Sequence, residues 1–189
     1  MNIERALRLS GYPPDAPRDE RIDELTWLAE KASKRHCIAE LGSWQRHSML
    51  AMADSMPSDG EAYAVDMWRD TPDMAPYNDR CRENPDFLIE SFLANIGVEL
   101  LSSKRVRPIR MSTLEAASYL WAVKFDMIFI DAAHDYESVK ADILAWRPLL
   151  VPGGLLCGHD YWHQGVAQAV RELLPTHVKT GTGSIWMVP

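Results

Sequence analysis

The stretch Phe125-Asp-Met-Ile-Phe-Ile130, followed directly by Asp131, is the strongest strand signal in the sequence. A short apolar run of this kind is typical of a strand buried on both faces of a sheet. A helix pattern starts a few residues later, where Asp135 is a candidate N-cap. Its inward positions follow at helical spacing: Val139, Ile143, Trp146 and Leu150. Strand and helix therefore form one unit, and the strand ends on an acidic residue.

The same strand–helix unit recurs on both sides of this stretch. Strand signals lie at residues 37–41, 62–65, 106–109 and 155–158, the last after a turn at Gly153-Gly154, with two short candidates at 177–179 and 184–188. Helix patterns lie at residues 19–33, 49–56, 87–96, 164–174, and from Ser112 or Thr113 to about 120. This alternation predicts an α/β fold: a doubly wound, mostly parallel, seven-stranded sheet with helices on both faces. We expect an N-terminal helical extension at residues 1–35 and the sheet domain at residues 36–189.

The composition of the chain limits what it can bind. Its 189 residues are 47% apolar and carry a formal charge of −7, which fits one globular domain with a substantial core. The acidic balance argues against nucleic acids and anionic membranes as partners. No apolar run approaches the roughly 18 residues of a membrane span, and the first residues lack the apolar core of a signal peptide. Three widely spaced cysteines form no disulfide framework or zinc motif, so we expect a reducing, cytoplasmic location.

Residues 67–85 show no helix or strand period and are rich in proline and aspartate. A loop of this length inside a compact domain is typical of a lid or a binding loop. We therefore expect it to cover a ligand site, with Tyr77 and Arg80 as candidate substrate contacts.

The ends of the first two strands carry the elements of a nucleoside site. Gly42, at the close of the first strand, permits a tight turn beside a ligand, and Asp66 closes the second strand 24 residues later. A carboxylate there is placed to accept hydrogen bonds from two ribose hydroxyls. Taken singly, Gly42 is also explained as a strand–helix turn and Asp66 as a cap. The stretch 42–48 lacks the second and third glycines of a dinucleotide fingerprint, so an adenosyl group without phosphates fits better than a pyrophosphate.

Four separated motifs resemble those of class I S-adenosylmethionine-dependent methyltransferases. The closest resemblance is to the small-molecule branch that includes macrocin-type and sugar O-methyltransferases, and it covers residues 36–189. The motifs are Glu40-Leu-Gly-Ser-Trp-Gln-Arg-His-Ser48, Val65-Asp-Met-Trp68, Phe129-Ile-Asp-Ala-Ala-His-Asp-Tyr136, and Pro152-Gly-Gly154 with Gly158-His-Asp-Tyr161. The chain departs from the family at Arg46 and His47, where Gly-Arg is usual, and at Arg110-Met111, where Gly-Asp is more frequent.

The resemblance implies roles in binding S-adenosylmethionine for the matched positions. Glu40, Gly42 and Ser43 would hold the methionine and ribose side, with Ser48 nearby, and Asp66 would bind the ribose hydroxyls. Around the adenine it implies Met67, Trp68, Met111 and Ser112. Asp131 completes the set at the reacting end.

The ends of the fourth and fifth strands carry the candidate chemistry. Asp131 and Asp160 should approach one another, with His159 beside them, and converging carboxylates suit an oxygen-preferring cation such as Mg²⁺. The metal would favour the alkoxide of a bound hydroxyl and orient it. His134, three residues after Asp131, is a candidate general base. His159 is an alternative base; purely structural roles for Asp131 and His134, and a site without metal, also remain open.

The tryptophans divide into two groups. Trp44, Trp68 and Trp162 lie beside candidate ligand positions, and the rings of Trp68 and Trp162 are placed to stack on adenine or substrate. Trp27, Trp121 and Trp146 fall at helical spacing and are expected in the core.

Together these features predict a methyltransferase that acts on a hydroxyl of a small molecule or sugar. A nicotinamide-dependent oxidoreductase on a Rossmann-like fold and a non-catalytic nucleoside-binding or scaffold module are the alternatives. A homo-oligomer is left open.

Overall fold

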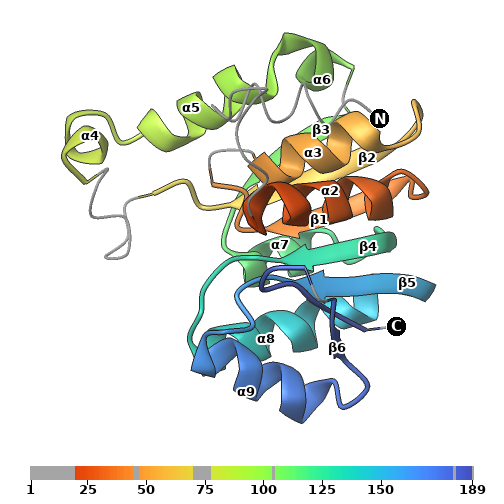
Figure 1. The fold of residues 1–189 in the computed structure, drawn as a ribbon. Helices are drawn as coiled ribbons and strands as arrows, with labels where there is room; N and C mark the ends of the chain where they lie inside the picture. The colour runs from red at the N-terminus through yellow and green to blue at the C-terminus, as the bar shows by residue number, and fades with distance from the viewer. Residues whose placement is uncertain (1–19, 45–46, 70–77, 104, 181, 189) are drawn as a thin grey trace.

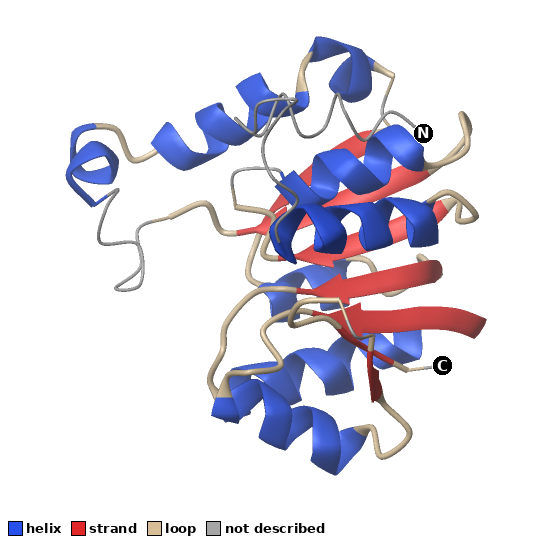
Figure 2. Ribbon diagram, in the orientation of Figure 1, coloured by secondary structure: helices blue, strands red, loops and turns tan. Residues whose placement is uncertain are grey.

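The computed structural model describes residues 20–44, 47–69, 78–103, 105–180 and 182–188. A seven-stranded sheet runs through the centre, with helices against both of its faces (Figures 1 and 2). The predicted fold class is therefore confirmed. The strands are β1 (Cys37–Leu41), β2 (Glu61–Asp66), β3 (Val106–Arg110), β4 (Phe125–Ile130), β5 (Leu150–Gly158), β6 (Val178–Lys179) and β7 (Trp186–Met187).

The strand order is β3-β2-β1-β4-β5-β7-β6. β1 to β5 are parallel, whereas β7 pairs antiparallel with β5 and β6 antiparallel with β7. The chain moves outward from β1 through β2 to β3 and then returns to place β4 on the other side of β1. Between β1 and β4 the direction of winding reverses, and in open α/β sheets ligands bind outside the carboxyl ends of strands at such a point.

Two layers of helices cover the sheet. One layer packs on the first core cluster and contains α2 (Glu20–Ala32), α3 (His47–Ser55), α5 (Phe87–Ile96) and α6 (Val98–Ser102). The other packs on the second cluster and contains α7 (Thr113–Tyr119), α8 (Tyr136–Trp146) and α9 (Gln164–Leu173). The short α4 (Asn78–Glu83) and the 3-10 turn η2 (Arg147–Leu149) complete the described elements.

The alternation of side chains along each strand explains why both faces need a helical layer. In β1, Ile38 belongs to the first cluster, whereas Ala39 and Leu41 belong to the second. In β4, Phe129 faces the first cluster and Ile128 the second. Because successive side chains point to opposite faces, a continuously apolar strand supplies both cores.

Helix ends agree with the sequence signals. Asp135 caps α8 by accepting from the backbone N–H of Ser138, and Ser112, one of two candidates, caps α7. Gly97, at φ +83°, follows the last residue of α5, so this helix ends at residue 96, where its predicted pattern ends.

Four local predictions are corrected. α4 lies inside the stretch 67–85 that was expected to be without helix, and α6 was not predicted. β5 starts at Leu150, so this residue and the Gly153-Gly154 pair belong to the strand rather than to a helix and a turn. Trp121 is 73% exposed and not a core residue, whereas Trp146 is fully buried.

The N-terminal helix α2 joins the same core as α3. Leu25, Leu28 and Ala32 are buried in the first cluster, and α2 packs along α3. A separate extension at residues 1–35 stays a prediction, because residues 1–19 lie outside the described ranges. Among the described helices, none combines the length and apolar character that a bilayer crossing requires.

Candidate functional site

The floor of the site is formed where the loops after β1 and β4 touch. Gly42 has φ +87°, and a Cβ built on it would lie 2.1 Å from the backbone oxygen of Asp131. Only glycine satisfies both the conformation and this contact. The backbone N–H of Asp131 donates to the oxygen of Leu41 at 2.8 Å. The two predicted site residues are thus held together at the point where the sheet reverses its winding.

Glu40 is a buried carboxyl beside this floor. It is fully buried, and neither of its carboxylate oxygens has a hydrogen-bond partner of normal geometry among the described residues. The Oγ of Ser43 is also buried and also lacks a hydrogen-bond partner of normal geometry among the described residues, and Ser48 is buried as well. Burial raises the pKa of Glu40 to about 8, although the hydroxyls of Ser43 and Ser48 oppose the shift. Unsatisfied buried polar groups are rare, and a ligand with a cationic or donor group would satisfy these.

Asp66 lies at the end of β2 in a cradle of backbone donors. Its carboxylate accepts from the N–H of Trp44 at 2.9 Å and of Trp68 at 2.7 Å. Both tryptophans have positive φ, 38° and 43° respectively. Burial raises the pKa of Asp66, and these backbone donors oppose the shift. Strained backbone that turns two N–H groups onto one carboxylate is a feature typical of binding loops.

The ring of Trp68 does not face a ligand space. It is fully buried against Phe92, with ring centroids 4.7 Å apart, and its Nε1–H donates to the backbone oxygen of Trp44. The expectation that this ring stacks on adenine is therefore corrected: the ring packs in the core and holds the backbone of Trp44, whose N–H donates to Asp66. Trp44 is 38% exposed beside the same cradle.

The remaining positions expected around the adenine lie at the carboxyl ends of β2 and β3. Met67 and Met111 are half-buried, and the N–H of Met111 donates to the backbone oxygen of Asp66 at 3.1 Å. The side chain of Ser112 forms a reciprocal capping box with Glu115 at the start of α7. This places Met111 next to the Asp66 cradle.

A histidine enclosed by carboxylates lies at the ends of β4 and β5. The Nδ1 of His159 is 3.5 Å from Asp131 Oδ1 and 3.3 Å from Asp160 Oδ1, and its Nε2 is 2.9 Å from Glu24 Oε1. The ligand atoms of Asp131, His159 and Asp160 all lie within 4.8 Å of one another. The expected approach of Asp131 and Asp160 beside His159 is thus confirmed as geometry.

The charges in this cluster stabilise one another. Burial works against the charged ring, but the carboxylates of Asp131, Asp160 and Glu24 raise the pKa of His159 to about 11. For Asp160, burial is outweighed by His134 and His159, which hold the pKa of its carboxyl well below the usual range. At neutral pH the cluster therefore contains an imidazolium among carboxylates.

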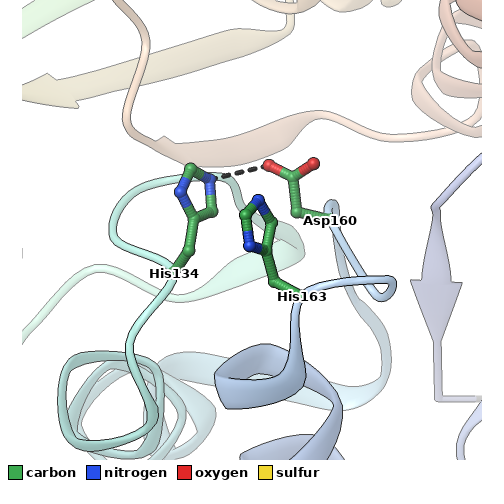
Figure 3. Close-up of side chains that lie close together, drawn as sticks. All are labelled: His134, Asp160 and His163. Atoms are coloured by element: carbon green, nitrogen blue, oxygen red, sulfur yellow. Dashed lines mark ion pairs between the residues drawn. The ribbon is translucent and has the colours of Figure 1, made fainter. Parts of the chain in front are cut away.

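His134 lies beside Asp160 and His163 (Figure 3), and it contacts the carboxylate oxygen of Asp160 that does not face His159. Its Nε2 is 2.7 Å from Asp160 Oδ2, and its side chain is 40% exposed. The ring of His163, at the start of α9, stacks on that of His134 with centroids 4.6 Å apart and planes 9° apart. Asp160 thus contacts one histidine with each carboxylate oxygen.

Asp160 itself has a strained backbone. Its φ is +57°, and its N–H donates to the Oγ of Ser184 at 3.2 Å. The three non-glycine residues with positive φ in the described ranges are Trp44, Trp68 and Asp160, and all three belong to this site. Such strain persists where the surrounding structure imposes it, which it does here on the carboxylate that joins both histidines.

Two residues of the site were missed from the sequence. Glu24 is 5% exposed on α2 and also accepts from the N–H of Ser184 at 2.9 Å. Its signal was an acidic residue four positions before Leu28, on the apolar face of the helix. His163 gave no comparable signal, because its neighbours in the site come from β4 and β5.

Of the two candidate substrate contacts, one lies outside the described residues and the other lies away from this cluster. Tyr77 falls outside the described residues, and the guanidinium of Arg80 packs over the ring of Phe87 at 5.4 Å. Trp162 is 69% exposed and directly precedes His163 in the chain. The centroid of its ring is 3.9 Å from that of His163.

Comparison with known proteins shows the family of the chain and a likeness of fold. A family profile described as "Methyltransferase domain" matches residues 39–161. No curated protein matches the chain. Three solved structures illustrate the likeness of fold, and each alignment covers 98% of this chain. One is an O-methyltransferase from Bacillus cereus in complex with SAH, with 17% identity, 88% of that chain covered and a TM-score of 0.64. The second is the O-methyltransferase TomG from Streptomyces achromogenes, involved in tomaymycin synthesis, in complex with SAM, with 19% identity, 86% of that chain covered and a TM-score of 0.61. The third is the calicheamicin methyltransferase CalS11, with 16% identity, 90% of that chain covered and a TM-score of 0.66.

Proposed function

The chain belongs to the family described as methyltransferase domain, and from this membership we propose that it transfers a methyl group from S-adenosylmethionine to a hydroxyl of a small molecule or sugar. The observation that carries the proposal is one sheet edge that joins a buried, unsatisfied binding floor to a histidine–carboxylate cluster. Similar folds in solved O-methyltransferases, two of them with SAH or SAM bound, support the donor and the oxygen acceptor.

The residues at the ends of β1 and β2 fit S-adenosylmethionine, the methyl donor. Glu40, neutral in the unliganded chain, would lose its proton beside the ammonium of the methionine moiety and offer it a carboxylate. The Ser43 hydroxyl offers a further polar contact. Gly42 lets the backbone approach closely, and Asp66 accepts from the ribose hydroxyls in its strained cradle. Ser48, Met67, Trp68, Met111 and Ser112 complete the proposed binding set, Trp68 through its backbone. When bound, the donor supplies an electrophilic methyl group on a sulfonium.

His134 is the proposed general base. With its Nε2–H directed at Asp160 Oδ2, the neutral ring carries its lone pair on Nδ1, which takes the proton of the acceptor hydroxyl. Asp160 selects this tautomer and stabilises the imidazolium that results. His159 is less suited to this role, since its pKa of about 11 keeps it protonated at neutral pH.

Asp131 and Asp160 also fit a divalent cation. Their carboxylates converge with His159 on one point, and the His159 proton now supplies the positive charge there. We propose that Mg²⁺ is held by Asp131 and Asp160, and that His159 becomes the third ligand when its proton leaves. The ion would supply Lewis acidity toward the acceptor oxygen.

Calorimetry tests the donor site directly. S-adenosylmethionine and S-adenosylhomocysteine should bind the wild-type chain, whereas NAD should not, because residues 42–48 lack the glycines that a pyrophosphate needs. Binding of NAD alone would contradict the proposal. Binding of none of the three would favour a non-catalytic module.

A chelator tests the metal separately. After treatment with EDTA, methyl transfer to a set of catechol, phenol and sugar acceptors should fall and should recover with added Mg²⁺. Unchanged turnover in EDTA would remove the metal from the mechanism and leave the His134 base in place.

A further inference from the structure

A second set of metal-binding side chains shares Asp160 with the proposed magnesium site. The ligand atoms of His134, His163 and Asp160 all lie within 4.8 Å of one another (Figure 3). We propose that these three residues bind a borderline transition-metal ion, Zn²⁺ above all, and that the bound ion inhibits the enzyme by occupying its general base.

The fold brings His163 against His134 by a specific contact. Gly165 lies two residues after His163, and a Cβ built on it would be 2.4 Å from the backbone oxygen of His134 and 2.7 Å from the backbone nitrogen of Tyr136. The first turn of α9 therefore rests directly on the loop after β4. Only glycine permits this approach, which places the two rings in a parallel stack.

The side chains are also held in place. The ring of His163 is packed between that of His134, at 4.6 Å, and that of Trp162, at 3.9 Å. His163 occupies the N-cap position of α9, but its side chain makes no capping hydrogen bond. The backbone N–H of Asp160 donates to the Oγ of Ser184, and its carboxylate oxygens contact His134 and His159. Metal ligands that are pre-organised in this way bind an ion with little loss of side-chain entropy.

The chemical type of the three side chains determines which metal ion they prefer. Two imidazoles and one carboxylate form a set that Zn²⁺ and its neighbours prefer, and three protein ligands leave a position open for water. Mg²⁺ prefers oxygen ligands, so it belongs with the carboxylate pair of the adjacent cluster. Asp160 serves both sites because Oδ2 faces His134, whereas Oδ1 faces His159.

Inhibition follows from the tautomer of His134, and this step rests on the proposed function. A metal on Nε2 displaces the proton that Nε2 shares with Asp160. The neutral ring then carries its one proton on Nδ1, which no longer accepts the proton of the acceptor hydroxyl. Zn²⁺ should therefore lower turnover even when Mg²⁺ is in excess.

The binding step is tested on the full chain without donor or acceptor. Co²⁺, a spectroscopic substitute for Zn²⁺, should give visible absorption bands of a site with low coordination number, and Zn²⁺ should displace it. His163→Ala should weaken Zn²⁺ binding in calorimetry by at least about tenfold. Loss of a residue that only hydrogen-bonds to a metal ligand already lowers metal affinity by about that factor, so loss of a ligand should cost no less. Asp131→Asn, which damages only the adjacent cluster, and His36→Ala, an exposed histidine elsewhere, should retain the affinity. Circular dichroism confirms that each variant is folded.

The inhibition step is tested with excess Mg²⁺ present. Zn²⁺ should inhibit the wild type. In His163→Ala, with turnover expressed relative to the same variant without Zn²⁺, the half-inhibitory Zn²⁺ concentration should rise at least about tenfold. Equal Zn²⁺ affinity in wild type and His163→Ala, loss of affinity in Asp131→Asn instead, or no binding at all would overturn the site. If no acceptor is ever turned over, the proposed function fails, but the cobalt spectrum and the calorimetry still decide the metal site.

Discussion

At the scale of single residues, Glu40 couples stability to binding. The folded chain retains its proton up to a pKa of about 8, whereas an unfolded chain loses it near the ordinary value of 4.5. Folding therefore takes up a proton between these values, and the stability falls as the pH rises from 4.5 to 8. Glu40→Gln, which mimics the neutral form, should raise the free energy of unfolding at pH 8 by roughly 2–4 kcal/mol in urea titrations. The gain should be small at pH 5.

The same substitution should weaken S-adenosylmethionine binding, because an amide offers no charge to an ammonium group. Asp142→Asn is a matched control, since Asp142 is also buried and burial raises its pKa to about 6. It should stabilise at pH 8 without affecting the donor. A Glu40→Gln variant that binds the donor as tightly as wild type would contradict the proposed role of Glu40.

His134 should affect turnover and not donor affinity. Replacing it with glutamine removes a general base and should lower kcat by about 10²–10⁴-fold. The dissociation constant for S-adenosylmethionine, measured by calorimetry, should stay within about twofold, because the donor floor lies at β1 and β2. An equal loss in donor affinity would instead place His134 in the donor site.

At the scale of elements, the junction of β1 and α3 depends on Gly42. Gly42→Ala should destabilise the chain by about 2 kcal/mol or more, because a Cβ would strike the backbone of Asp131 at an unfavourable φ. Gly97→Ala is a matched control: its φ is +83°, but no atom lies within 4 Å of the added Cβ. Thermal unfolding should show a larger loss for Gly42→Ala. Equal losses would mean that the close approach of the two loops costs nothing.

The start of α7 positions the edge of the donor floor. Ser112 accepts from the N–H of Glu115, and the Glu115 side chain accepts in return from the N–H of Ser112. Ser112→Ala should cost about 1 kcal/mol of unfolding free energy in urea titrations. Ser118→Ala on the same helix, whose hydroxyl only donates back to Leu114, should change it much less. A larger effect of Ser118→Ala would show that the capping box does not stabilise α7.

At the scale of the whole molecule, several groups with shifted pKa values contribute to the pH dependence of stability, among them Glu24, Glu40, His159 and Asp160. Glu24 and Asp160 have lowered pKa values, so their contribution is present above about pH 4.5 and lost on acidification. His159 has a raised pKa, so its contribution is full below 6.5 and lost as the pH rises toward 11. Glu40 adds to the alkaline decline. The unfolding free energy, measured in urea with EDTA present, should therefore be greatest at about pH 5–6.

Glu24→Gln provides the control for this profile. It removes the carboxylate through which α2 contacts the sheet edge, so the acidic limb should become shallower and the overall stability should fall. Stability that rises steadily from pH 6 to 9 in the wild type would contradict the charge assignment.

The sequence by itself determined the fold class and most of the site positions. Apolar runs such as 125–130, each followed by a helical period, specify parallel strands with covering helices, because a strand buried on both faces is apolar at most of its positions. That topology carries the carboxyl ends of the strands to one edge. Glu40, Asp66, Asp131 and Asp160 could therefore be placed there from sequence alone. Signals of short range, such as the Asp135 cap, were equally readable.

Only the tertiary structure decided which of these groups are in contact and which charge state each of them adopts. Glu24 meets His159 from a helix 135 residues earlier in the chain, and His163 meets His134 because Gly165 lets two loops approach. Trp68 turned inward rather than toward a ligand, since its ring completes the core against Phe92. Such outcomes depend on burial and on distances between segments remote in sequence. A periodic pattern reports the local chain alone, whereas charge states and shared ligands arise from the sum of all neighbours.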